Sequence, residues 1–541
     1  MRKIRAQFSA SFLLLFTLVC GTTSLAFAQE EQQRERRVEN ATTQPAASVA
    51  PVAATRGSAP KSIEELRARI QEVLKRAELA PAQVAVKVAS LETGRVLYEE
   101  NAEKLLHPAS VMKMFTIAAA LDRLTPDFRF KTSVYTAARP DASGNVRGDL
   151  VIYGRGDPSI AARFNNGDYE KGIDELAARI VAAGVKRVEG DLVGDESYFT
   201  GAPHGFGWEW ADLQWYSGAE VSALSVNDNA LDLFIKPGAN VGAPCTITTG
   251  PTTSGVTFTN RTTTTARGTK RELSIYRSLG DNVIEIGGSL PMDDTGWTGA
   301  VAAPRPALLF VSMLRASLAR RGVTITGRTR AVDARERAAA PLQISALTEI
   351  AMQQSPPLGE IAAQTMKPSQ NLYAELILRA LGNATRKDAK LSSEEAGLEA
   401  VKALLREAGA DTGLLILTDG SGLSRRDLVT ADASLKLLAY MERHRYAKVF
   451  RDTFPLAGSE GTLRNRMKGT VAAGNVRAKT GSLPTIAALA GYVTSAAGER
   501  LAFSILINNY SESSTARRSY IDEIAVLLAS FNGKSGEQSL K

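Results

Sequence analysis

The sequence predicts an α+β fold in which a long, mostly β insertion splits one discontinuous domain. Two observations predict it. The chain begins with a helical pattern followed by a hairpin pattern, and it ends with further helices and hairpins. Between them, from about residue 131 to 288, short strand-like runs alternate with Gly, Asn, Asp and Thr, and one helical pattern interrupts them. The two ends are therefore expected to form one domain and the middle to form the insertion.

Length and composition describe an ordinary globular protein. The chain has 541 residues, room for about three domains at ~150 residues each. A hydrophobic share of 44% and a charged share of 23% exclude collagen-like, wholly disordered and multi-span membrane classes. The net charge of +8 includes three basic residues of the leader described next, and the rest is too small a surplus to predict nucleic-acid binding.

Residues 1–28 form a predicted signal peptide. A basic start, an apolar run at 12–19 and a small-residue cleavage site at 26–28 follow one another as in such leaders. The alternative, an uncleaved membrane anchor, is disfavoured because the apolar run is too short to span a bilayer. The protein is therefore expected to be exported, to a periplasmic or other extracytoplasmic space, with no transmembrane helix after removal of the leader. Cys245 then remains alone, so no intrachain disulfide is expected.

Residues 29–61 are predicted to be a disordered tether. They contain no aromatic residue, Leu or Ile, so they cannot bury enough apolar surface to offset the entropy of ordering. The folded part is expected to begin at Ser62, which has the spacing of a capping box with Glu65. Residues 536–541 are assigned to a tail.

The remaining elements follow from apolar periodicity. A 3.6-residue period predicts an amphipathic helix at 63–77, and the alternation at 84–88 with its return at 95–99 predicts a hairpin. Pro108 is expected to open a helix with a buried face. Further helices are expected at 172–183, 307–320, 358–365, 371–381, 394–408 and 519–529, and further strands at 132–137, 150–153, 255–260, 273–276, 283–286, 476–478, 489–494 and 501–507.

Several kinds of chemistry are disfavoured because their residues are missing. The chain has three histidines, none in a metal-ligand spacing, so neither a metal nor a cofactor is expected. No serine lies in a G-x-S-x-G nucleophile elbow. Gly154-x-Gly156 lacks the third glycine of a dinucleotide site and predicts a tight turn, and Gly533-Lys534-Ser535 lacks the upstream glycine of a P-loop.

A serine–lysine motif is the first candidate for catalysis. Ser110-x-x-Lys113 places both side chains on one face of the first turn of a predicted helix. The lysine amine can take the serine proton if burial or nearby cations keep it neutral, and the helix start directs backbone N–H groups at a developing oxyanion. Alone the motif is weak, because Ser110 could be a helix cap and Lys113 a solvated charge. The sequence Ser58-x-x-Lys61 in the tether has the same spacing.

Two further motifs follow. Ser369-x-Asn371 lies between two predicted helices, where a hydroxyl could relay a proton and an amide could orient the base, or Ser369 could be another helix cap. The same S-x-N pattern occurs at 143–145 and 225–227. Lys479-Thr480-Gly481 occurs once and follows a strand pattern. A lysine, a hydroxyl and a residue without a side chain on one strand suit the binding of a carboxylate where another backbone segment comes close. The alternative is that Lys479 is an exposed lysine at the edge of a sheet.

In this order the three motifs resemble those of the penicillin-recognising serine acyltransferases, the penicillin-binding proteins and serine β-lactamases. The 255 residues between Lys113 and Ser369 are similar to the long insertion of low-molecular-mass class C penicillin-binding proteins, the penicillin-binding protein 4 type of D-alanyl-D-alanine carboxypeptidase/endopeptidase. Pro484 departs from the polar residue that some relatives carry after the K-T-G strand, which leaves the detail of the substrate pocket open. Further sequence segments that resemble those of this family occur at 154–159, 190–199, 222–224, 419–425, 461–466 and 478–483.

The resemblance implies a β-lactamase/transpeptidase-like domain, an antiparallel sheet flanked by helices. It would be built from residues 62–130 and 341–535 and interrupted by an inserted β-rich region of one or two domains at residues 131–340.

The resemblance also implies catalytic roles in acyl transfer from a peptidoglycan stem peptide to a serine. Lys113 would deprotonate Ser110, which would attack the D-Ala carbonyl. Backbone N–H groups of Ser110 and Ser482 would form the oxyanion hole. Ser369 would pass a proton to the leaving D-amino acid, and Asn371 would hold the substrate amide and Lys113. Water would then release the acyl group.

The implied substrate-binding residues are Lys479-Thr480-Gly481 for the terminal carboxylate, and Arg425 with Asp195 for the third stem residue. An arginine fork matches a carboxylate bidentately, so Arg425 is expected to recognise a free carboxylate such as diaminopimelate carries. Asp195 would hold the free amine of the same residue. The alternative is that Arg425 and Arg426 are a solvated basic pair after a turn.

Other functions stay open from the sequence. A β-lactamase is disfavoured because no Glu-x-x-Leu-Asn deacylation motif occurs between residues 371 and 479. An esterase of the same superfamily and a non-catalytic cell-wall-binding protein are the remaining alternatives. The expected partners are peptidoglycan stem peptides, with β-lactams as covalent inhibitors and no nucleic acid. A peripheral contact with the membrane or the wall is left open.

Overall fold

The computed structural model describes residues 58–252, 255–278, 280–510 and 514–536. The predicted signal peptide, most of the predicted tether and most of the predicted tail lie outside the described residues. Residues 58–61, expected to belong to the tether, are described, and the buried Pro60 accepts a hydrogen bond on its carbonyl from the N–H of Asn532 at 2.9 Å. The folded part therefore begins earlier than predicted. No helix among the described residues is both long and apolar enough to cross a membrane.

The two ends of the chain share one five-stranded antiparallel sheet. Its strand order is β17-β18-β19-β1-β2, so the N-terminal hairpin pairs with the C-terminal strands through β1 and β19. This confirms the α+β class, with one sheet built from both ends. The strands are β1 (Gln83–Ser90), β2 (Val96–Glu100), β17 (Arg477–Leu483), β18 (Ile486–Thr494) and β19 (Arg500–Asn508).

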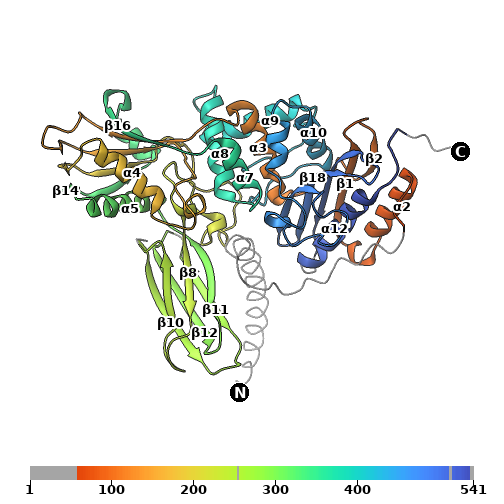
Figure 1. Ribbon diagram of the computed structural model, residues 1–541, viewed down its shortest axis with the longest axis horizontal. Helices are drawn as coiled ribbons and strands as arrows, with labels where there is room; N and C mark the ends of the chain where they lie inside the picture. Colours follow the sequence, from red (N-terminus) through yellow and green to blue (C-terminus); the bar gives the residue numbers. More distant parts are fainter. Residues whose placement is uncertain (1–57, 253–254, 279, 511–513, 537–541) are drawn as a thin grey trace, which may run out of the picture.

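Helices cover both faces of this sheet (Figure 1). Val86 and Val88 of β1 face the core under α2 and α12, whereas Ala85 and Ala89 face the core around α3, as strand alternation requires. On the second face α10 lies against the sheet, and α3 packs against α7, α8 and α9. Neither α10 nor α11 was among the predicted elements. The helices are α2 (Ile63–Leu74), α3 (Met112–Leu124), α7 (Leu358–Met366), α8 (Asn371–Thr385), α9 (Ser393–Glu407), α10 (Ala431–Glu442), α11 (Ala447–Asp452) and α12 (Ser514–Ser530).

The insert contains a mixed α/β unit. A five-stranded sheet of order β15-β7-β5-β3-β16 has α5 against it, with α4 beside α5, and a small sheet β14-β6-β4 lies next to it. β16 pairs with β3, so the sheet of the insert extends past residue 340, the predicted end. The elements are β3 (Lys131–Thr136), β4 (Asn145–Val146), β5 (Leu150–Gly154), α4 (Lys171–Ala182), β6 (Arg187–Val188), β7 (Leu192–Asp195), α5 (Pro306–Arg320), β14 (Thr324–Ile325), β15 (Thr329–Val332), α6 (Ala334–Ala339) and β16 (Thr348–Gln354).

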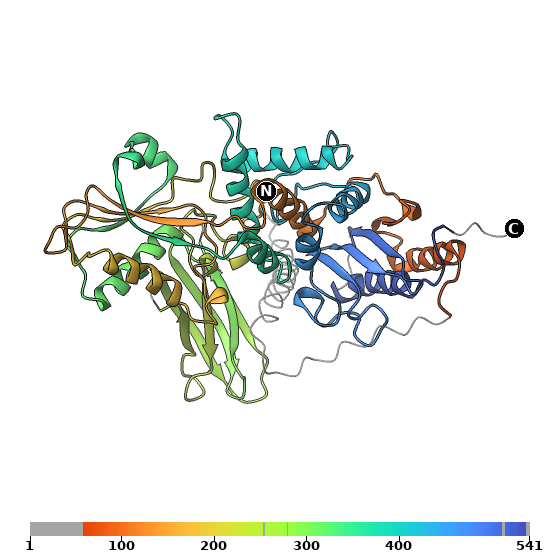
Figure 2. The same ribbon diagram turned by 45° about the horizontal axis from the view of Figure 1, so that its top comes forward.

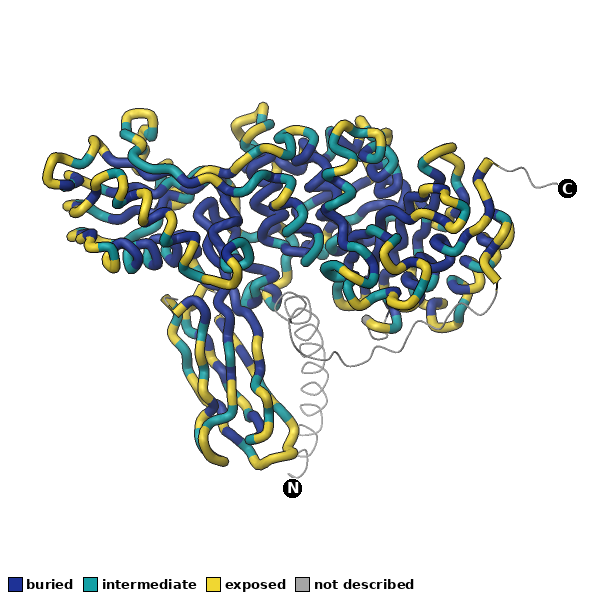
Figure 3. The backbone as a smooth tube through the Cα atoms, viewed as in Figure 1, coloured by how far each residue is buried: buried dark blue, intermediate teal, exposed yellow. Residues whose placement is uncertain are grey.

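The rest of the insert is an all-β unit. Its two three-stranded sheets, β13-β8-β9 and β10-β12-β11, project from the body of the molecule (Figure 3). The strands β9 to β12 mix buried and more exposed positions, whereas β8 and β13 are buried along most of their length. Cys245 is a free thiol buried in this unit. The predicted β-rich insert therefore corresponds to this all-β unit, whereas the α/β unit also contains the two long helices α4 and α5. The strands are β8 (Ala230–Lys236), β9 (Thr246–Gly250), β10 (Thr257–Thr265), β11 (Glu272–Arg277), β12 (Val283–Pro291) and β13 (Trp297–Ala302).

The helices α7 and α8 lie between the sheet domain and the insert in both views (Figures 1 and 2). A hydrogen bond joins the two sides at the start of α8, where Asn371 Nδ2 donates to the carbonyl of Ser217 at 2.9 Å. The second predicted motif is therefore at the boundary between the two parts of the molecule.

Candidate active site

The turn that carries Ser110 is a single 3₁₀ turn in front of a buried helix. Pro108 precedes the turn Ala109–Val111, and α3 follows directly. Ser110 was expected in the first turn of an α-helix. The tighter turn forms instead because Ala109 has φ +45°, which a continuous right-handed helix does not allow. Lys113 lies in the first turn of α3 and is fully buried.

The side-chain nitrogen of Lys113 is the centre of the site. Nζ donates hydrogen bonds to Ser110 Oγ at 2.8 Å, to Asn371 Oδ1 at 2.6 Å and to the carbonyl of Ser421 at 2.8 Å. Two of the three predicted motifs therefore meet at this atom. A lysine nitrogen at hydrogen-bond distance from a serine oxygen is placed to exchange a proton with it.

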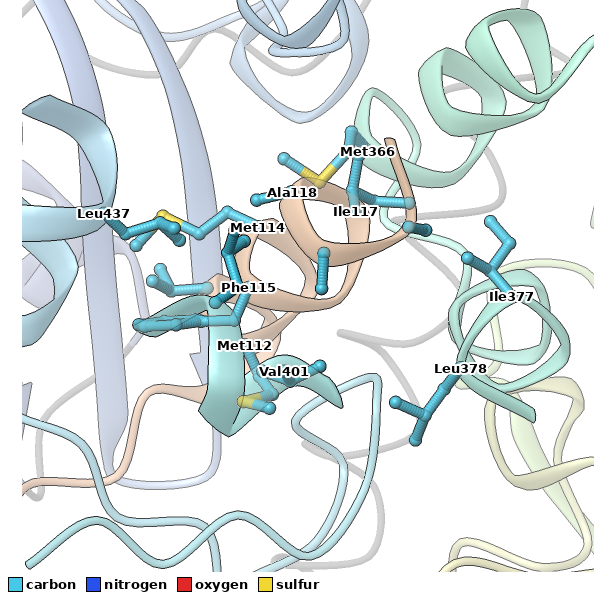
Figure 4. Close-up of a cluster of buried hydrophobic side chains, with 14 of the residues drawn as sticks. Met112, Met114, Phe115, Ile117, Ala118, Met366, Ile377, Leu378, Val401 and Leu437 are labelled. Carbon is cyan, nitrogen blue, oxygen red and sulfur yellow. The ribbon is translucent and has the colours of Figure 1, made fainter. Parts of the chain in front are cut away.

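The helix α3 holds Lys113 rigidly because apolar side chains surround it. Figure 4 shows the cluster, in which residues of α3 meet residues of α7, α8, α9 and α10. A side chain on a fully packed helix has few alternative rotamers, so the distance from Lys113 to Ser110 is fixed by the core. The labelled members are Met112, Met114, Phe115, Ile117, Ala118, Met366, Ile377, Leu378, Val401 and Leu437.

The second motif bridges the first and the third. Ser369 lies between α7 and α8, is buried, and has φ +69°. Its Oγ accepts a hydrogen bond from Lys479 Nζ at 2.8 Å. Asn371 is the first residue of α8, and the side chain of Gln370 accepts from the N–H of Leu372 to cap that helix. Two sets of hydrogen bonds therefore meet at the second motif: Asn371 joins it to Lys113, and Ser369 joins it to Lys479.

The third motif lies on β17, the edge strand of the sheet. Gly481 packs against the Ser110 turn: a Cβ at this position would lie 2.4 Å from the carbonyl oxygen of Pro108 and 3.2 Å from the Cβ of Ala109. Glycine is therefore the residue that lets the strand approach the turn this closely. Lys479 is fully buried, and Thr480 Oγ1 donates to Thr462 Oγ1 at 2.8 Å.

The outer edge of β17 faces away from β18. The N–H of Ala478 donates to the carbonyl of Pro455 at 3.2 Å, on the side opposite β18. Because strand backbone alternates, the N–H groups of Thr480 and Ser482 face this same edge. The Oγ of Ser482 accepts a hydrogen bond from Arg518 Nη2 at 3.1 Å.

Replacing Gly481 with alanine is expected to push β17 away from the Ser110 turn. A displacement of about 1 Å between reacting groups costs on the order of 100-fold in rate, so acylation by benzylpenicillin should fall about 10- to 100-fold. Gly359→Ala is the matched control, since its Cβ would make only ordinary contacts, the nearest at 3.4 Å from Val449. Equal acylation rates in the two variants would contradict the close approach.

The loop 419–424 brings a backbone carbonyl to Lys113. Asp419 accepts from the N–H groups of Gly422 at 2.6 Å and Ser424 at 2.8 Å, which folds the loop around its carboxylate. Gly422 has φ +78°, and a Cβ there would lie 1.9 Å from the carbonyl oxygen of Ala109. The loop therefore packs on the Ser110 turn, and Ser421 directs its carbonyl at Lys113.

Arg425 is bound to a loop of the insert. Its Nη2 lies 3.3 Å from Glu209 and 3.7 Å from Asp212, and its N–H donates to the carbonyl of Gly207 at 3.2 Å. Burial raises the pKa of Asp212, and the charge of Arg425 partly offsets that rise. Arg425 is thus paired with two acids, neither of which the sequence analysis singled out, and is not one of a solvated basic pair. Its neighbour Arg426 stacks on Phe206, 4.9 Å from the ring centroid.

Asp195 does not pair with Arg425. It ends β7 in the sheet of the α/β unit, is fully buried, and receives hydrogen bonds on Oδ2 from Arg337 at 2.5 and 3.0 Å. A carboxylate that is buried and occupied by an arginine has no surface to offer a substrate amine. This placement counts against the predicted role of Asp195. The acids of the insert that lie beside Arg425 are Glu209 and Asp212.

Buried acids lie behind the loop that contacts Lys113. Glu375 accepts from the N–H of Gly420 at 3.0 Å. Burial raises its pKa well above the usual range, and the charge of Asp419 raises it further. Burial and Asp419 also raise the pKa of Asp427. Among the described residues, no group of three or more His, Cys, Asp or Glu is placed to hold a metal ion.

The chain is similar to known D-alanyl-D-alanine carboxypeptidases along most of its length. The sequence model of the D-Ala-D-Ala carboxypeptidase 3 (S13) family matches residues 66–531. A D-alanyl-D-alanine carboxypeptidase of Actinomadura sp. (strain R39) is 35% identical over 490 residues, which cover 88% of this chain and 87% of the relative. The D-alanyl-D-alanine carboxypeptidase DacB of Haemophilus influenzae is 28% identical over 435 residues, covering 79% and 86% of the two chains.

A solved structure agrees. The crystal structure of penicillin binding protein 4 from Haemophilus influenzae superimposes with a TM-score of 0.73 at 26% sequence identity, covering 85% of this chain and 99% of that one. These similarities confirm the resemblance drawn from the three motifs and the long insertion. The chain belongs to the D-Ala-D-Ala carboxypeptidase 3 (S13) family and is a serine-type D-Ala-D-Ala carboxypeptidase.

Proposed function

We propose that Ser110 is the nucleophile with which this carboxypeptidase removes the terminal D-Ala of peptidoglycan stem peptides and cleaves cross-links of the same D-Ala type. The observation that carries the proposal is the 2.8 Å contact between Lys113 Nζ and Ser110 Oγ. The second motif lies beside it, with Asn371 bonded to Lys113 and Ser369 bonded to Lys479 of the third motif.

Acylation begins when the neutral amine of Lys113 takes the proton of Ser110 Oγ, which attacks the carbonyl carbon of the penultimate D-Ala. The developing oxyanion is held by backbone N–H groups of Ser110 and Ser482, the second of which lies on the outer edge of β17. Collapse of the tetrahedral intermediate breaks the peptide bond. The proton that Lys113 accepted is relayed through Ser369, which contacts Lys479 at 2.8 Å, to the leaving amine, so Lys113 is neutral again.

Deacylation repeats the chemistry with water. Neutral Lys113 takes a proton from a water molecule that attacks the acyl carbonyl, and returns it to Ser110 Oγ as the ester bond breaks. Asn371 orients Lys113 through the 2.6 Å hydrogen bond and has an amide with which to hold the substrate. Lys479, Thr480 and Gly481 bind the terminal carboxylate at the edge of β17.

β-Lactams are proposed to acylate Ser110 and to leave slowly, because the ring-opened acyl group keeps its leaving group attached. A structure of the Haemophilus influenzae protein was determined with a β-lactam bound. Export is proposed from the predicted signal peptide, since the peptidoglycan substrate lies outside the cytoplasm.

The proposed function is tested by incubating the protein with a stem pentapeptide and measuring free D-Ala. Release of one D-Ala per peptide is expected. Fast turnover of nitrocefin, or ester hydrolysis without D-Ala release, would favour the β-lactamase or esterase alternatives. Failure to bind fluorescent penicillin together with no D-Ala release would favour a non-catalytic wall-binding protein.

Arg425 is proposed to recognise the free carboxylate of the third stem residue. Arg425→Ala should lower the rate on diaminopimelate peptides about 10- to 100-fold, because a charge-assisted hydrogen bond is worth ~1.5–3 kcal/mol. Rates on lysine or amidated analogues should change little. Arg426→Ala is the matched control, since that neighbour stacks on Phe206 instead. Equal rates on both substrates in the parent, unchanged in Arg425→Ala, would leave Arg425 as a structural ion pair.

A further inference from the structure

His107 is a buried histidine that contacts two loops of the site with its two ring nitrogens. Its Nδ1 lies 2.9 Å from the N–H of Ala109, and its Nε2 lies 2.6 Å from the carbonyl oxygen of Ser424. Ala109 immediately precedes Ser110, and Ser424 immediately precedes Arg425. One imidazole ring therefore connects the turn that carries the proposed nucleophile to the loop that carries the proposed specificity residue.

The two partners define the protonation state of the ring. A backbone N–H can only donate, so Nδ1 must be the accepting, bare nitrogen. A carbonyl oxygen can only accept, so Nε2 must carry the hydrogen. The charged form would put a second hydrogen on Nδ1, facing the N–H of Ala109. The structure therefore fits the neutral Nε2–H tautomer of His107 alone.

The backbone of His107 is fixed from a third side. Its N–H donates to Asn508 Oδ1 at 2.7 Å, and its carbonyl accepts from Asn508 Nδ2 at 3.1 Å. The adjacent Leu106 exchanges two backbone hydrogen bonds of 2.9 Å with Val429, after the Arg425 loop. The ring of His107 is therefore held in one position on both sides, unlike the side chain of a mobile surface histidine.

The turn that His107 supports is under backbone strain. Ala109 has φ +45°, a conformation that costs about 1 kcal/mol or more for a residue with a side chain. The hydrogen bond from its N–H to Nδ1 helps to hold that conformation. Losing the bond would let the turn relax and would move Ser110 relative to Lys113.

We propose that His107 is a positioning residue with two separable actions: its Nδ1 holds the Ser110 turn in its strained conformation, and its Nε2–H holds the Ser424 carbonyl and so the placement of Arg425. The inference rests on the proposed roles of Ser110 and Arg425. It adds that the alignment of the nucleophile and the selection of the third stem residue are coupled through one side chain.

The surroundings keep the ring neutral at physiological pH. Burial lowers the pKa of His107, and the charge of Arg425 lowers it further, while the Ser424 carbonyl and the carboxylate of Asp419 act in the opposite direction. The folded pKa lies below the unfolded value, so the neutral ring contributes stability above about pH 6.5. This stability is lost as the pH falls from there through the folded pKa.

Two substitutions separate the two actions because each keeps one polar atom of the ring. The Oδ1 of asparagine replaces Nδ1 as an acceptor, so His107→Asn keeps the contact with Ala109 and loses that with Ser424. The amide nitrogen of glutamine replaces Nε2–H as a donor, so His107→Gln keeps the contact with Ser424 and loses that with Ala109. His107→Leu loses both, and none of the three variants titrates.

The experiment measures two quantities in the full chain. The first is the second-order rate constant for acylation by benzylpenicillin, which has no second carboxylate for Arg425. The second is the ratio of kcat/KM for stem peptides with free and with amidated carboxylate on the third residue. His107→Gln should lower acylation about 10- to 100-fold and keep the ratio. His107→Asn should keep acylation within about threefold and lower the ratio about tenfold.

The outcomes separate this inference from the proposed function. If the parent is not acylated, the proposed function fails. If the parent is acylated but the asparagine and glutamine variants lose both quantities equally, or lose neither, His107 has only a structural role and the inference is overturned.

A measurement on the parent protein tests the inference even if the His107 variants do not fold. Nitrogen-15 NMR of histidine-labelled protein at pH 7 should show the Nε2–H tautomer for His107, assigned by comparison with the variants of His204 and His444, the other two histidines. An Nδ1–H tautomer or a charged ring would overturn the inference. Lowering the pH from 7 to 5 should reduce the melting temperature more in the parent than in His107→Gln.

Discussion

Replacing Ser110 with alanine is expected to abolish covalent labelling by benzylpenicillin and to lower D-Ala release by at least about 10⁴-fold. The reason is that Ser110 Oγ is the hydroxyl that contacts Lys113 Nζ, at 2.8 Å. Alanine removes the attacking atom and leaves the binding groups in place, and the loss of a serine nucleophile costs other serine hydrolases on the order of 10⁶-fold. The fold should be unaffected, because the side chain becomes smaller at a partly exposed position.

The matched control is Ser58→Ala, which alters the second S-x-x-K sequence of the chain. Ser58 is exposed, and its carbonyl accepts a hydrogen bond from Arg69. This variant should be labelled like the parent, with the added mass on the peptide that contains Ser110. Covalent labelling that survives in Ser110→Ala would show that another residue is acylated.

Replacing Lys113 with arginine is expected to reduce acylation by about 10³-fold or more. A guanidinium stays protonated at any pH a protein tolerates, so it cannot take the proton of Ser110. It is also larger than an amine and must enter a fully buried position that already has three short hydrogen bonds. Lys61→Arg, in the S-x-x-K sequence outside the site, should have no effect.

The pH dependence of the parent gives a second test of the same role. A protonated Lys113 cannot act as a base, so acylation should rise with pH on its acid limb, by up to tenfold per pH unit. Stopped-flow or quench-flow acylation rates from mildly acidic to alkaline pH would show this limb. A rate that is independent of pH over that range would count against Lys113 as the base.

The helices and strands that carry the site could be read from the sequence because their signals are local. Apolar periodicity predicted α8, which begins at Asn371. The alternation around Val476 and Ala478 predicted the strand of the K-T-G motif. The missed helix α10 also had local signals, since Thr430 caps it by accepting from Ala433, and Leu435, Leu438 and Met441 follow at helical spacing.

The backbone strain of the site could not be read in this way. Ala109 and Ser369 both have positive φ, although neither is a residue type that favours it. Ala109 is held by tertiary contacts, including the close approach of Gly422 and Gly481. The local pattern of residue types cannot predict such contacts, because the contacting residues are far apart in the sequence. The position of Ser110 in a 3₁₀ turn was therefore predicted wrongly as the first turn of an α-helix.

The acids that pair with Arg425 could not be found from the sequence for a related reason. Asp195 and Asp212 both lie in the insert, more than 200 residues before Arg425, so their local sequence could not show which one reaches it. The loop at 205–212 had one unusual signal: it carries Phe206 and Trp210, which remain largely exposed. Large apolar side chains exposed together on a loop favour a binding surface over a core.

The most direct test of the central claim is digestion of purified, cross-linked muropeptides followed by mass analysis. The proposed acyl-enzyme on Ser110 predicts that pentapeptide stems lose one D-Ala, that dimers joined through D-Ala are split into monomers, and that benzylpenicillin prevents both. Muropeptides of unchanged mass, or products that form equally in the presence of benzylpenicillin and in Ser110→Ala, would contradict it.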